Sequence, residues 1–217
     1  MARTESQFSP EPADPDRYTA ANDRLYTRFA RLYDTVVKAL PVWRRWLSRA
    51  VPEIRGPRVL EVSFGTGWLL TQYAGRCRTD GIDLNSKLIG IARRNLAKAG
   101  QSADWRQGRV EELPYPDATF DTVVNTMAFT GYPDGAAAAA ELARVLKPGG
   151  RLVLIDINFP SDGNRRGTAL VEHVWKPAGD LIRDTPALLA DAGLDVDVEE
   201  IGGWGSVQLY LATKPAA

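Results

Sequence analysis

Two carboxylates and a pair of glycines form the pattern in this sequence that is best suited to holding a small molecule. Glu61 lies in the apolar run at residues 58–62, and Gly65 and Gly67 follow that run directly. Glycine tolerates backbone conformations that other residues resist, so its N–H group can approach a ligand closely. Asp83 ends the next apolar segment, where a carboxylate can accept hydrogen bonds from a ribose diol. Glu61 is placed to hold an ammonium group.

Other interpretations of the glycine pair are open at this point. An ordinary tight turn after a strand has the same composition, and it explains the pair about as well as a ligand does. The dinucleotide-binding pattern needs a third glycine, where this chain has Leu70. Two carboxylates without a basic phosphate clamp favour a nucleoside with a positively charged tail over a dinucleotide.

These residues must be positioned by a sheet, and the hydrophobic pattern predicts one. Short apolar runs predict strands at residues 58–62, 79–83, 103–107, 120–124 and 151–155. Helical patterns lie between them at residues 68–74, 86–99 and 134–146. This alternation is typical of a doubly wound α/β sheet, whose parallel strands bring their carboxyl ends to one edge. Residues 195–201 and 206–213 break the alternation and predict an antiparallel hairpin.

Two of these helices carry clear start signals. Asn85 or Ser86 can cap the helix at residues 86–99, which Gly100 ends, and Asp134 can cap the alanine-rich helix. Such side chains accept hydrogen bonds from the free N–H groups of a first helical turn. The signals therefore fix where both helices begin.

Composition divides the chain into a tail and one domain. Residues 1–16 are rich in proline and polar side chains, which bury too little apolar surface to offset the entropy of ordering, so we expect a flexible tail. Residues 17–217 are expected to form a single domain, with a helical lid at 17–55 and a ligand-binding core at 56–217. Within the core, residues 157–184 are long for a connection and are expected to form a substrate-side insertion.

The overall composition excludes several classes of function. The 217 residues carry 27 basic and 27 acidic side chains, and this zero net charge argues against nucleic-acid binding. One cysteine, Cys77, and one histidine, His173, exclude an intramolecular disulfide and a metal site built from His or Cys clusters. No apolar run approaches the ~20 residues that span a bilayer. We therefore expect a cytoplasmic protein without an integral membrane segment, and a homodimer stays open.

The chain contains, in this order, the segments VLEVSFGTG, GIDLN, GRVEELPYPDATFDTVV and ELARVLKPGGRLVLID. They resemble the successive motifs of the class I S-adenosylmethionine-dependent methyltransferases, over roughly residues 33–213. The chain is most similar to the branch that includes the ubiquinone and menaquinone C-methyltransferases. The resemblance implies a Rossmann-like, doubly wound, mainly parallel sheet of seven strands, with a C-terminal antiparallel hairpin and an N-terminal helical lid. It also implies S-adenosyl-L-methionine as the cofactor and methyl transfer to a small molecule.

The resemblance further implies a set of cofactor contacts around the glycine turn. Glu61 would bind the methionine ammonium, and Asp83 would take the ribose hydroxyls. Tyr33, which forms a Tyr-Asp pair with Asp34 in the lid, would lie over the cofactor. The implied cofactor-binding residues are Tyr33, Glu61, Ser63, Gly65, Thr66, Gly67, Asp83, Leu84, Val110, Glu111, Asn125 and Thr126.

The chain departs from the family pattern at two positions. The first glycine of the turn is Ser63, which adds a side chain where the backbone approaches the ligand. The acidic residue that reads the adenine amino group after Gly108 is replaced by Arg109, and arginine accepts no hydrogen bond. Adenine recognition is therefore expected to shift, for example to the backbone.

Methyl transfer from a sulfonium is an in-line displacement, so the protein mainly supplies alignment and needs a base only if the acceptor must lose a proton. The candidate catalytic residues are Asp156, His173 and Tyr33. His173 titrates near neutrality, but a surface or packing histidine is the commoner case. Asp156, at the end of the fifth strand, could equally cap a helix or bind the tyrosines of the lid.

Aromatic residues in the lid favour a lipophilic or aromatic acceptor, although aromatic residues at helical spacing usually face a core. The chain lacks the Asn/Asp-Pro-Pro-aromatic motif after Asn125, which disfavours methylation of a nucleobase or amide nitrogen. The acceptor atom, carbon, oxygen or nitrogen, stays open. Two alternatives compete: a protein that binds S-adenosylmethionine without methylating, such as a cyclase, and an NAD-type oxidoreductase.

Overall fold

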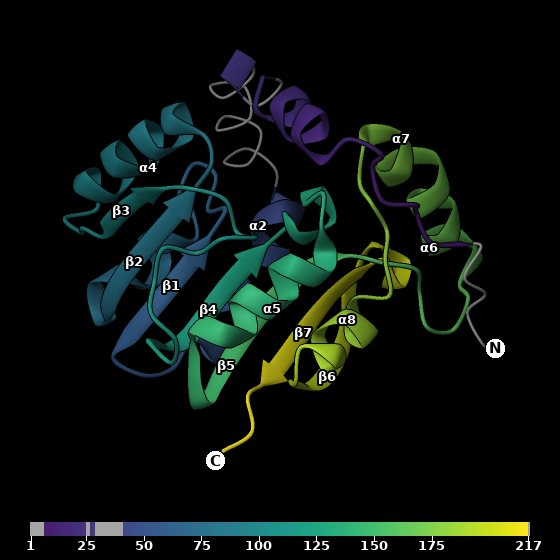
Figure 1. Cartoon of the computed structure of the whole chain (residues 1–217). Coiled ribbons are helices and arrows are strands. Elements are labelled where there is room, and N and C mark those ends of the chain that lie inside the picture. Colours follow the sequence, from purple (N-terminus) through teal and green to yellow (C-terminus); the bar gives the residue numbers. More distant parts are fainter. Residues whose placement is uncertain (1–6, 25–26, 29–40, 217) are drawn as a thin grey trace.

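The chain forms seven strands in the computed structural model, which describes residues 7–24, 27–28 and 41–216 (Figure 1). Branched and aromatic side chains are frequent in the strands at residues 120–126 and 207–213, as is typical of strands buried in a sheet, whereas the strands at 104–107 and 195–202 are mostly polar. The strands are β1 (Arg58–Val62), β2 (Arg78–Asp83), β3 (Asp104–Gln107), β4 (Phe120–Thr126), β5 (Leu146–Ile157), β6 (Asp195–Gly202) and β7 (Val207–Thr213).

The strands form one sheet in the order β3-β2-β1-β4-β5-β7-β6. β1 to β5 pair in parallel, whereas β7 runs antiparallel to both of its neighbours, β5 and β6. The predicted doubly wound sheet and its C-terminal hairpin are therefore confirmed. Chain order reverses between β1 and β4, and ligands bind at such a switch point, beyond the carboxyl ends of the strands.

Helices and short helical turns connect the strands. Asn85 caps α4 by accepting hydrogen bonds from the N–H groups of Lys87 and Leu88, and Asp134 caps α5 in the same way, so both predicted start signals are confirmed. Residues 15–24 are helical as well. The other elements are α2 (Pro41–Ser48), η2 (Val51–Glu53), α3 (Leu70–Tyr73), η3 (Ala74–Arg76), α4 (Ser86–Lys98), η4 (Phe129–Gly131), α5 (Gly135–Val145), α6 (Arg165–Leu170), η5 (Val171–Trp175), α7 (Lys176–Ala178), α8 (Thr185–Asp191) and η6 (Gly203–Gly205).

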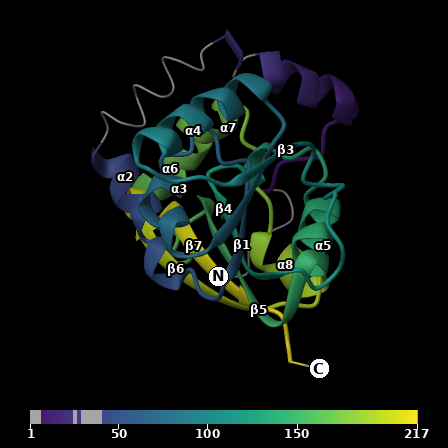
Figure 2. The same ribbon diagram turned by 90° about the vertical axis from the view of Figure 1, so that its left-hand side faces the viewer.

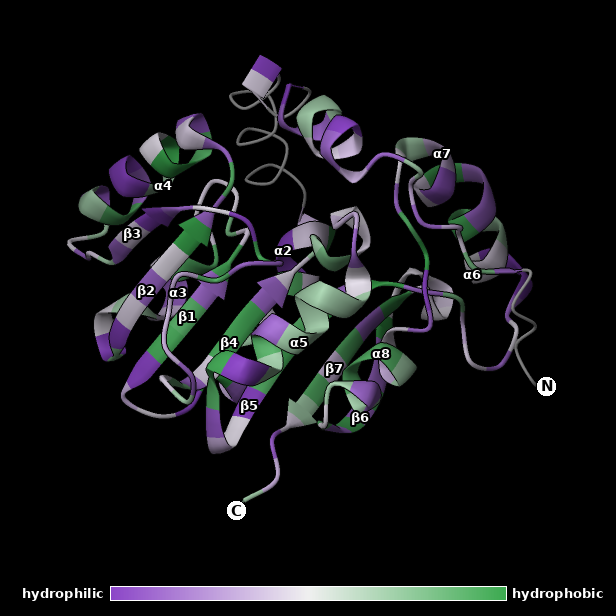
Figure 3. Ribbon diagram, viewed as in Figure 1, coloured by the Kyte–Doolittle hydropathy of each residue, from purple (hydrophilic) through white to green (hydrophobic). Residues whose placement is uncertain are grey.

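Two apolar cores lie on the two faces of the sheet. Helices α3 and α4 cover one face, and α5 and α8 cover the other (Figure 2). Successive residues of one strand serve opposite cores: Val123 packs with the α5 side and Val124 with the α3–α4 side. Both faces of these strands are thus buried: neither β4 nor β7 has an exposed residue, and hydrophobic colours occupy the middle of β4 and much of β7 (Figure 3). The sheet is a rigid base for whatever its carboxyl edge carries.

The helix at residues 15–24 lies beyond the carboxyl ends of the parallel strands in both views (Figures 1 and 2). Ahead of it, Ser9 exchanges two hydrogen bonds with Ile182, one from its own N–H at 2.7 Å and one accepted by its hydroxyl at 3.0 Å. The boundary of the flexible tail at residue 16 stays a prediction. In the described part of the chain, no helix combines the length and the apolar character needed to cross a membrane.

Candidate active site

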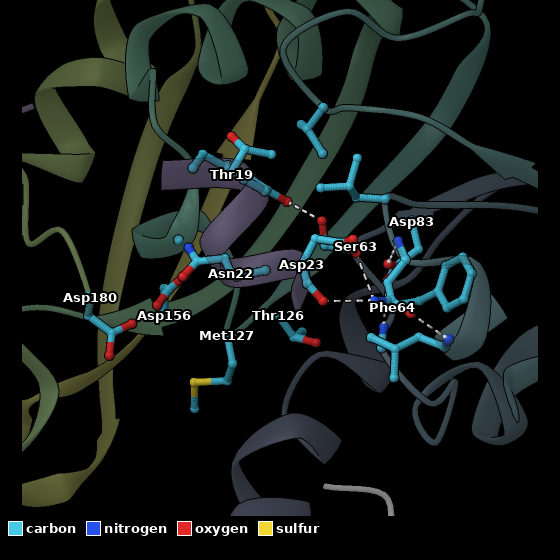
Figure 4. Close-up of a pocket in the computed structure, with 18 of the residues that line it drawn as sticks. Thr19, Asn22, Asp23, Ser63, Phe64, Asp83, Thr126, Met127, Asp156 and Asp180 are labelled. Atoms are coloured by element: carbon cyan, nitrogen blue, oxygen red, sulfur yellow. Dashed lines mark hydrogen bonds between the residues drawn. The ribbon is translucent and has the colours of Figure 1, made fainter. Parts of the chain in front are cut away.

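A cavity of about 350 Å³ lies at the carboxyl edge of the sheet. This volume is in the range of small-molecule sites. Its floor comes from the ends of β1, β2, β4 and β5, and its roof comes from the helix at residues 15–24. Asp83 and Ser63 lie at one end and Asp156 and Asp180 at the other, with Met127 between them (Figure 4). The cavity therefore has two polar ends under one lid.

Glu61 is a buried carboxyl group in the lining of the cavity, with 1% of its surface exposed. The hydroxyl of Tyr73 donates to its Oε2 at 2.7 Å. Burial raises the pKa of Glu61 to about 8; the bond from Tyr73 lowers it, and the charge of Asp83 adds to the rise. A positively charged group in the cavity would favour the ionised form, so this site suits an ammonium ion.

The glycine turn has left-handed backbone conformations at Ser63, Gly65 and Gly67, with φ of 50°, 56° and 71°. Ser63 adopts the glycine-like conformation although it carries a side chain. Its hydroxyl accepts a hydrogen bond at 2.8 Å from Tyr132, whose own hydroxyl accepts one from the amide of Asn125. This chain of hydrogen bonds offsets part of the strain, so the departure from glycine leaves the path of the turn intact.

Gly67 is needed for packing rather than for a ligand contact. A Cβ at this position would lie 2.7 Å from the Cβ of Ala92 in α4. The absence of a side chain therefore lets the turn approach α4 closely. This is the usual function of the last glycine in nucleotide-binding turns.

Asp83 is the polar group at the end of β2, with 6% of its surface exposed. Its two oxygens accept hydrogen bonds from the N–H groups of Gly65, at 3.0 Å, and Asn85, at 2.8 Å. Burial raises the pKa of Asp83 to about 6, these backbone bonds lower it, and the carboxylate of Asp23 raises it further. The bonds fix the carboxylate between two loops, with capacity left to accept from a diol in the cavity.

The roof helix is bound to the sheet at both of its ends. Near its start, Arg109 donates to Asp16 at 2.8 Å. Near its end, the amide of Asn85 donates to Asp23 at 2.7 Å and to Thr27 at 2.6 Å. Arg109, which replaces an expected adenine-reading acid, thus binds the lid.

Asp156 and Asp180 share one hydroxyl group at the far end of the cavity. Asp156, with 1% of its surface exposed, accepts hydrogen bonds from the N–H groups of Phe129, Thr130 and Ile157. The hydroxyl of Thr130 lies 2.9 Å from Asp156 and 2.7 Å from Asp180. Burial raises the pKa of Asp156 to about 6, and the charge of Asp180 adds to the rise.

The structure brings most of the sequence-predicted site residues together around the cavity, but not all. Gly67, Asn125 and His173 are not among the residues that line it, and His173 is exposed on η5. The catalytic role predicted for His173 stays a prediction. Tyr33 lies outside the described residues. The predicted residues found in the lining are Glu61, Ser63, Gly65, Thr66, Asp83, Leu84, Val110, Glu111, Thr126 and Asp156.

Several lining residues were not predicted from the sequence. Asp23 and Asp180 line the cavity from segments that are distant in sequence from the glycine turn. Tyr132 lies on the loop after β4 and binds Ser63. For Asp23, the sequence signal closest to this contact lies at its partner Asn85. The capping pattern there indicated a helix start and not a contact with the lid.

The chain is similar in sequence to known methyltransferases. A family model described as a methyltransferase domain matches residues 60–154. Over 138 residues the chain is 35% identical to a phosphatidylethanolamine N-methyltransferase of Cereibacter sphaeroides, an alignment that covers 63% of this chain and 68% of that relative. It is 33% identical over 162 residues to a demethylmenaquinone methyltransferase of Deinococcus radiodurans, with coverage of 71% and 67%. The chain thus spans about two thirds of these relatives.

Solved structures share the fold at lower identity. The crystal structure of the [4+2]-cyclase SpnF matches with a TM-score of 0.65 and 22% identity, covering 87% of this chain and 81% of that chain. Such a likeness establishes the arrangement of strands and helices alone.

Proposed function

Because this chain belongs to the class I S-adenosylmethionine-dependent methyltransferases, we propose that it transfers the methyl group of S-adenosylmethionine to a small acceptor that has a lipophilic or aromatic part. The observation that carries the proposal is the division of one lidded cavity into two ends. One end has the Glu61 and Asp83 carboxylates beside the glycine turn. The other end has Asp156 and Asp180 and lies beside aromatic rings.

The residues of the first end fit the cofactor. Asp83 has capacity left to accept hydrogen bonds from ribose hydroxyls. Glu61 is buried without a cation beside it among the described residues, which raises its pKa and suits a positively charged group of the cofactor. Glu111 has a buried Oε1 without a hydrogen-bond donor among the described residues. An N–H donor of the nucleoside would satisfy it, which offers a route to adenine recognition in place of the acid that Arg109 replaces.

The bound cofactor supplies an electrophilic methyl group on a sulfonium. The protein supplies alignment, which is worth ~7–11 kcal/mol when reacting groups are held in place. The rigid ends of β1 and β4 position the glycine turn, while the lid, bound through Arg109 and Asn85, covers the cavity and excludes water. Asp156 already accepts four hydrogen bonds, so we assign it to holding the loop after β4 rather than to moving a proton.

We place the acceptor between the lid and residues 157–184, the predicted substrate-side insertion. Trp43 and Trp175 line this part of the cavity, with ring centroids 6.5 Å apart. One relative is named for a phospholipid, phosphatidylethanolamine, and the other for demethylmenaquinone, and both names support an acceptor with a large apolar part.

The test is transfer of labelled methyl groups. Purified protein is incubated with S-adenosylmethionine labelled in its methyl group and with a mixture of lipophilic amines, phenols and hydroquinones. We expect label in an organic-soluble product together with an equal amount of S-adenosylhomocysteine, and neither with Asp83→Ala. Asp104→Asn, an exposed carboxyl on β3, is the matched control and should behave as wild type. Tight cofactor binding without S-adenosylhomocysteine on any acceptor would favour the non-methylating alternative.

A further inference from the structure

At the end of the cavity where we place the methyl acceptor, two carboxyl groups compete for one hydroxyl hydrogen. Thr130 has one hydroxyl hydrogen, yet its oxygen lies within hydrogen-bond distance of Asp156 Oδ1, at 2.9 Å, and Asp180 Oδ1, at 2.7 Å. With both carboxyl groups ionised, one of these contacts would bring two lone pairs together. A further proton must therefore lie on one of the two carboxyl groups, or a cation must lie beside them.

The two carboxyl groups are not equivalent. Three backbone N–H groups stabilise the charge of Asp156, whereas Thr130 is the one donor found for Asp180 in the described chain. Burial raises the pKa of both carboxyl groups, that of Asp156 to about 6. Both residues line the cavity, but the carboxyl group of Asp156 is also engaged with the loop after β4. The smaller number of donors therefore favours Asp180 as the member of the pair that gains and loses the proton.

Asp180 is held firmly in this position. Gly179, with φ of 106°, ends α7, and the N–H of Asp180 then donates to the carbonyl of Trp175 at 3.2 Å. The next N–H, from Leu181, donates to the carbonyl of Thr130 at 2.8 Å. The lid meets the same turn, because the hydroxyl of Tyr18 donates to the carbonyl of Gly179 at 2.8 Å.

The charges around this end are negative and its walls are aromatic. Among the described residues that line the cavity, Arg109 is the one basic residue, and it binds the lid at the cofactor end. Two cations of neighbouring segments, Lys176 and Arg183, lie outside the lining of the cavity. Lys176 binds Gln7 and Glu172. Arg183 donates to the carbonyls of Tyr132 and Pro133 and pairs with Glu11, and its charge also acts on Asp156 and Tyr18.

We propose that the acceptor is an amine, bound as an ammonium ion by the Asp180 carboxylate beside the rings of Tyr18, Trp43 and Trp175. Aromatic faces attract cations, and an ammonium group supplies charged N–H donors to the Asp180 carboxylate, for which Thr130 is the one donor found in the described chain. The inference rests on the proposed function and narrows its substrate class.

The proton and electron balance is simple. Asp180 takes one proton from the ammonium, which leaves a neutral amine with a free electron pair and a protonated carboxyl group that donates to Thr130. The amine nitrogen forms a bond to the methyl carbon as the carbon–sulfur bond breaks and its electron pair stays on sulfur. The product is the methylated ammonium, and Asp180 returns its proton to solvent when the lid opens.

Matched pairs of ligands test the inference on the complex with S-adenosylhomocysteine. Each pair is a primary amine and the alcohol with the same carbon skeleton: phenethylamine and 2-phenylethanol, tryptamine and tryptophol, octylamine and octanol. Calorimetry first measures S-adenosylhomocysteine binding and then the binding of each pair member. We expect amines to bind at least about tenfold more tightly than their alcohols, as a charge-assisted hydrogen bond requires.

Two variants distinguish the effect of Asp180 on the preference for amines from the effect of a change in the protein's net charge. Asp180→Asn should abolish the preference for amines, whereas Asp197→Asn, the same change at an exposed position of β6, should keep it. Alcohols binding as well as amines to the wild type, no amine binding to the cofactor complex, or an unchanged preference in Asp180→Asn would each overturn the inference. Because the wild-type comparison needs no variant, poor folding of Asp180→Asn leaves the test intact. Failure of S-adenosylhomocysteine to bind at all would instead refute the proposed function.

Discussion

Glu61 should make cofactor binding depend on pH in the neutral range. Its carboxyl group is buried against Tyr73, and its pKa is raised to about 8 before any ligand binds. Binding the ammonium of the cofactor requires the ionised form. Below pH 8 the protein must therefore release a proton as the ligand enters, and affinity should fall as pH decreases.

The size of the effect follows from that pKa. A carboxyl group with a pKa of about 8 is ionised to roughly 3% at pH 6.5 and roughly 24% at pH 7.5, so affinity should rise roughly eightfold over this interval. Asp83, with a pKa of about 6, is mostly ionised throughout and contributes less than about twofold. In Glu61→Gln the carboxyl group is gone while an oxygen for Tyr73 remains, so only the small contribution of Asp83 should persist.

Calorimetric titration with S-adenosylhomocysteine at pH 6.5, 7.0 and 7.5 measures this dependence. Each titration is repeated in two buffers with different ionisation enthalpies, which gives the number of protons released. Wild type should release nearly one proton at pH 6.5, and Glu61→Gln should release far less and bind more weakly at pH 7.5. An affinity that is flat with pH in wild type, without proton release, would refute the assignment of Glu61 to the ammonium.

Three further outcomes concern stability and are measured by urea unfolding of the ligand-free protein. Tyr132→Phe should lower the free energy of unfolding by about 1–3 kcal/mol, because a buried hydrogen-bond chain is broken, whereas Tyr115→Phe, whose buried hydroxyl has no partner among the described residues, should not. Gly67→Ala should cost more than Gly100→Ala: both have positive φ, which costs about 1–2 kcal/mol, but only the former also overlaps a neighbouring side chain. Glu61→Gln should stabilise at pH 8, since the folded pKa lies above the unfolded value; the native carboxyl loses stability as pH rises from about 4.5 through 8, and equal stability of both forms would contradict this.

Much of the fold could be predicted because its signals are local. Parallel strands buried on both faces read as continuous apolar runs, and β1 begins and ends where its run does. The start of α4 is also a local signal, because the adjacent residues Asn85 and Ser86 are both good helix caps. The glycine turn and Asp83 also follow from strand ends, since carboxyl ends of neighbouring parallel strands meet at one edge.

The acceptor end could not be predicted in the same way. Asp180 meets Thr130 across 50 residues of sequence, and Arg109 meets Asp16 across 93. The sequence around each residue does not indicate such a contact, because an aspartate that is exposed in a loop has the same kind of neighbours in sequence as one that binds a distant residue. Ser63 shows the converse: its departure from glycine was visible, but the compensating bond from Tyr132 was not.

The central claim is that this cavity binds S-adenosylmethionine through the end that contains Asp83. Calorimetric titration of wild type and Asp83→Ala with S-adenosylhomocysteine and with NADH tests it most directly. We predict that S-adenosylhomocysteine binds wild type, that the substitution weakens this binding at least about tenfold through lost charge-assisted hydrogen bonds, and that NADH does not bind. Binding of NADH, or no binding of S-adenosylhomocysteine to wild type, would contradict it.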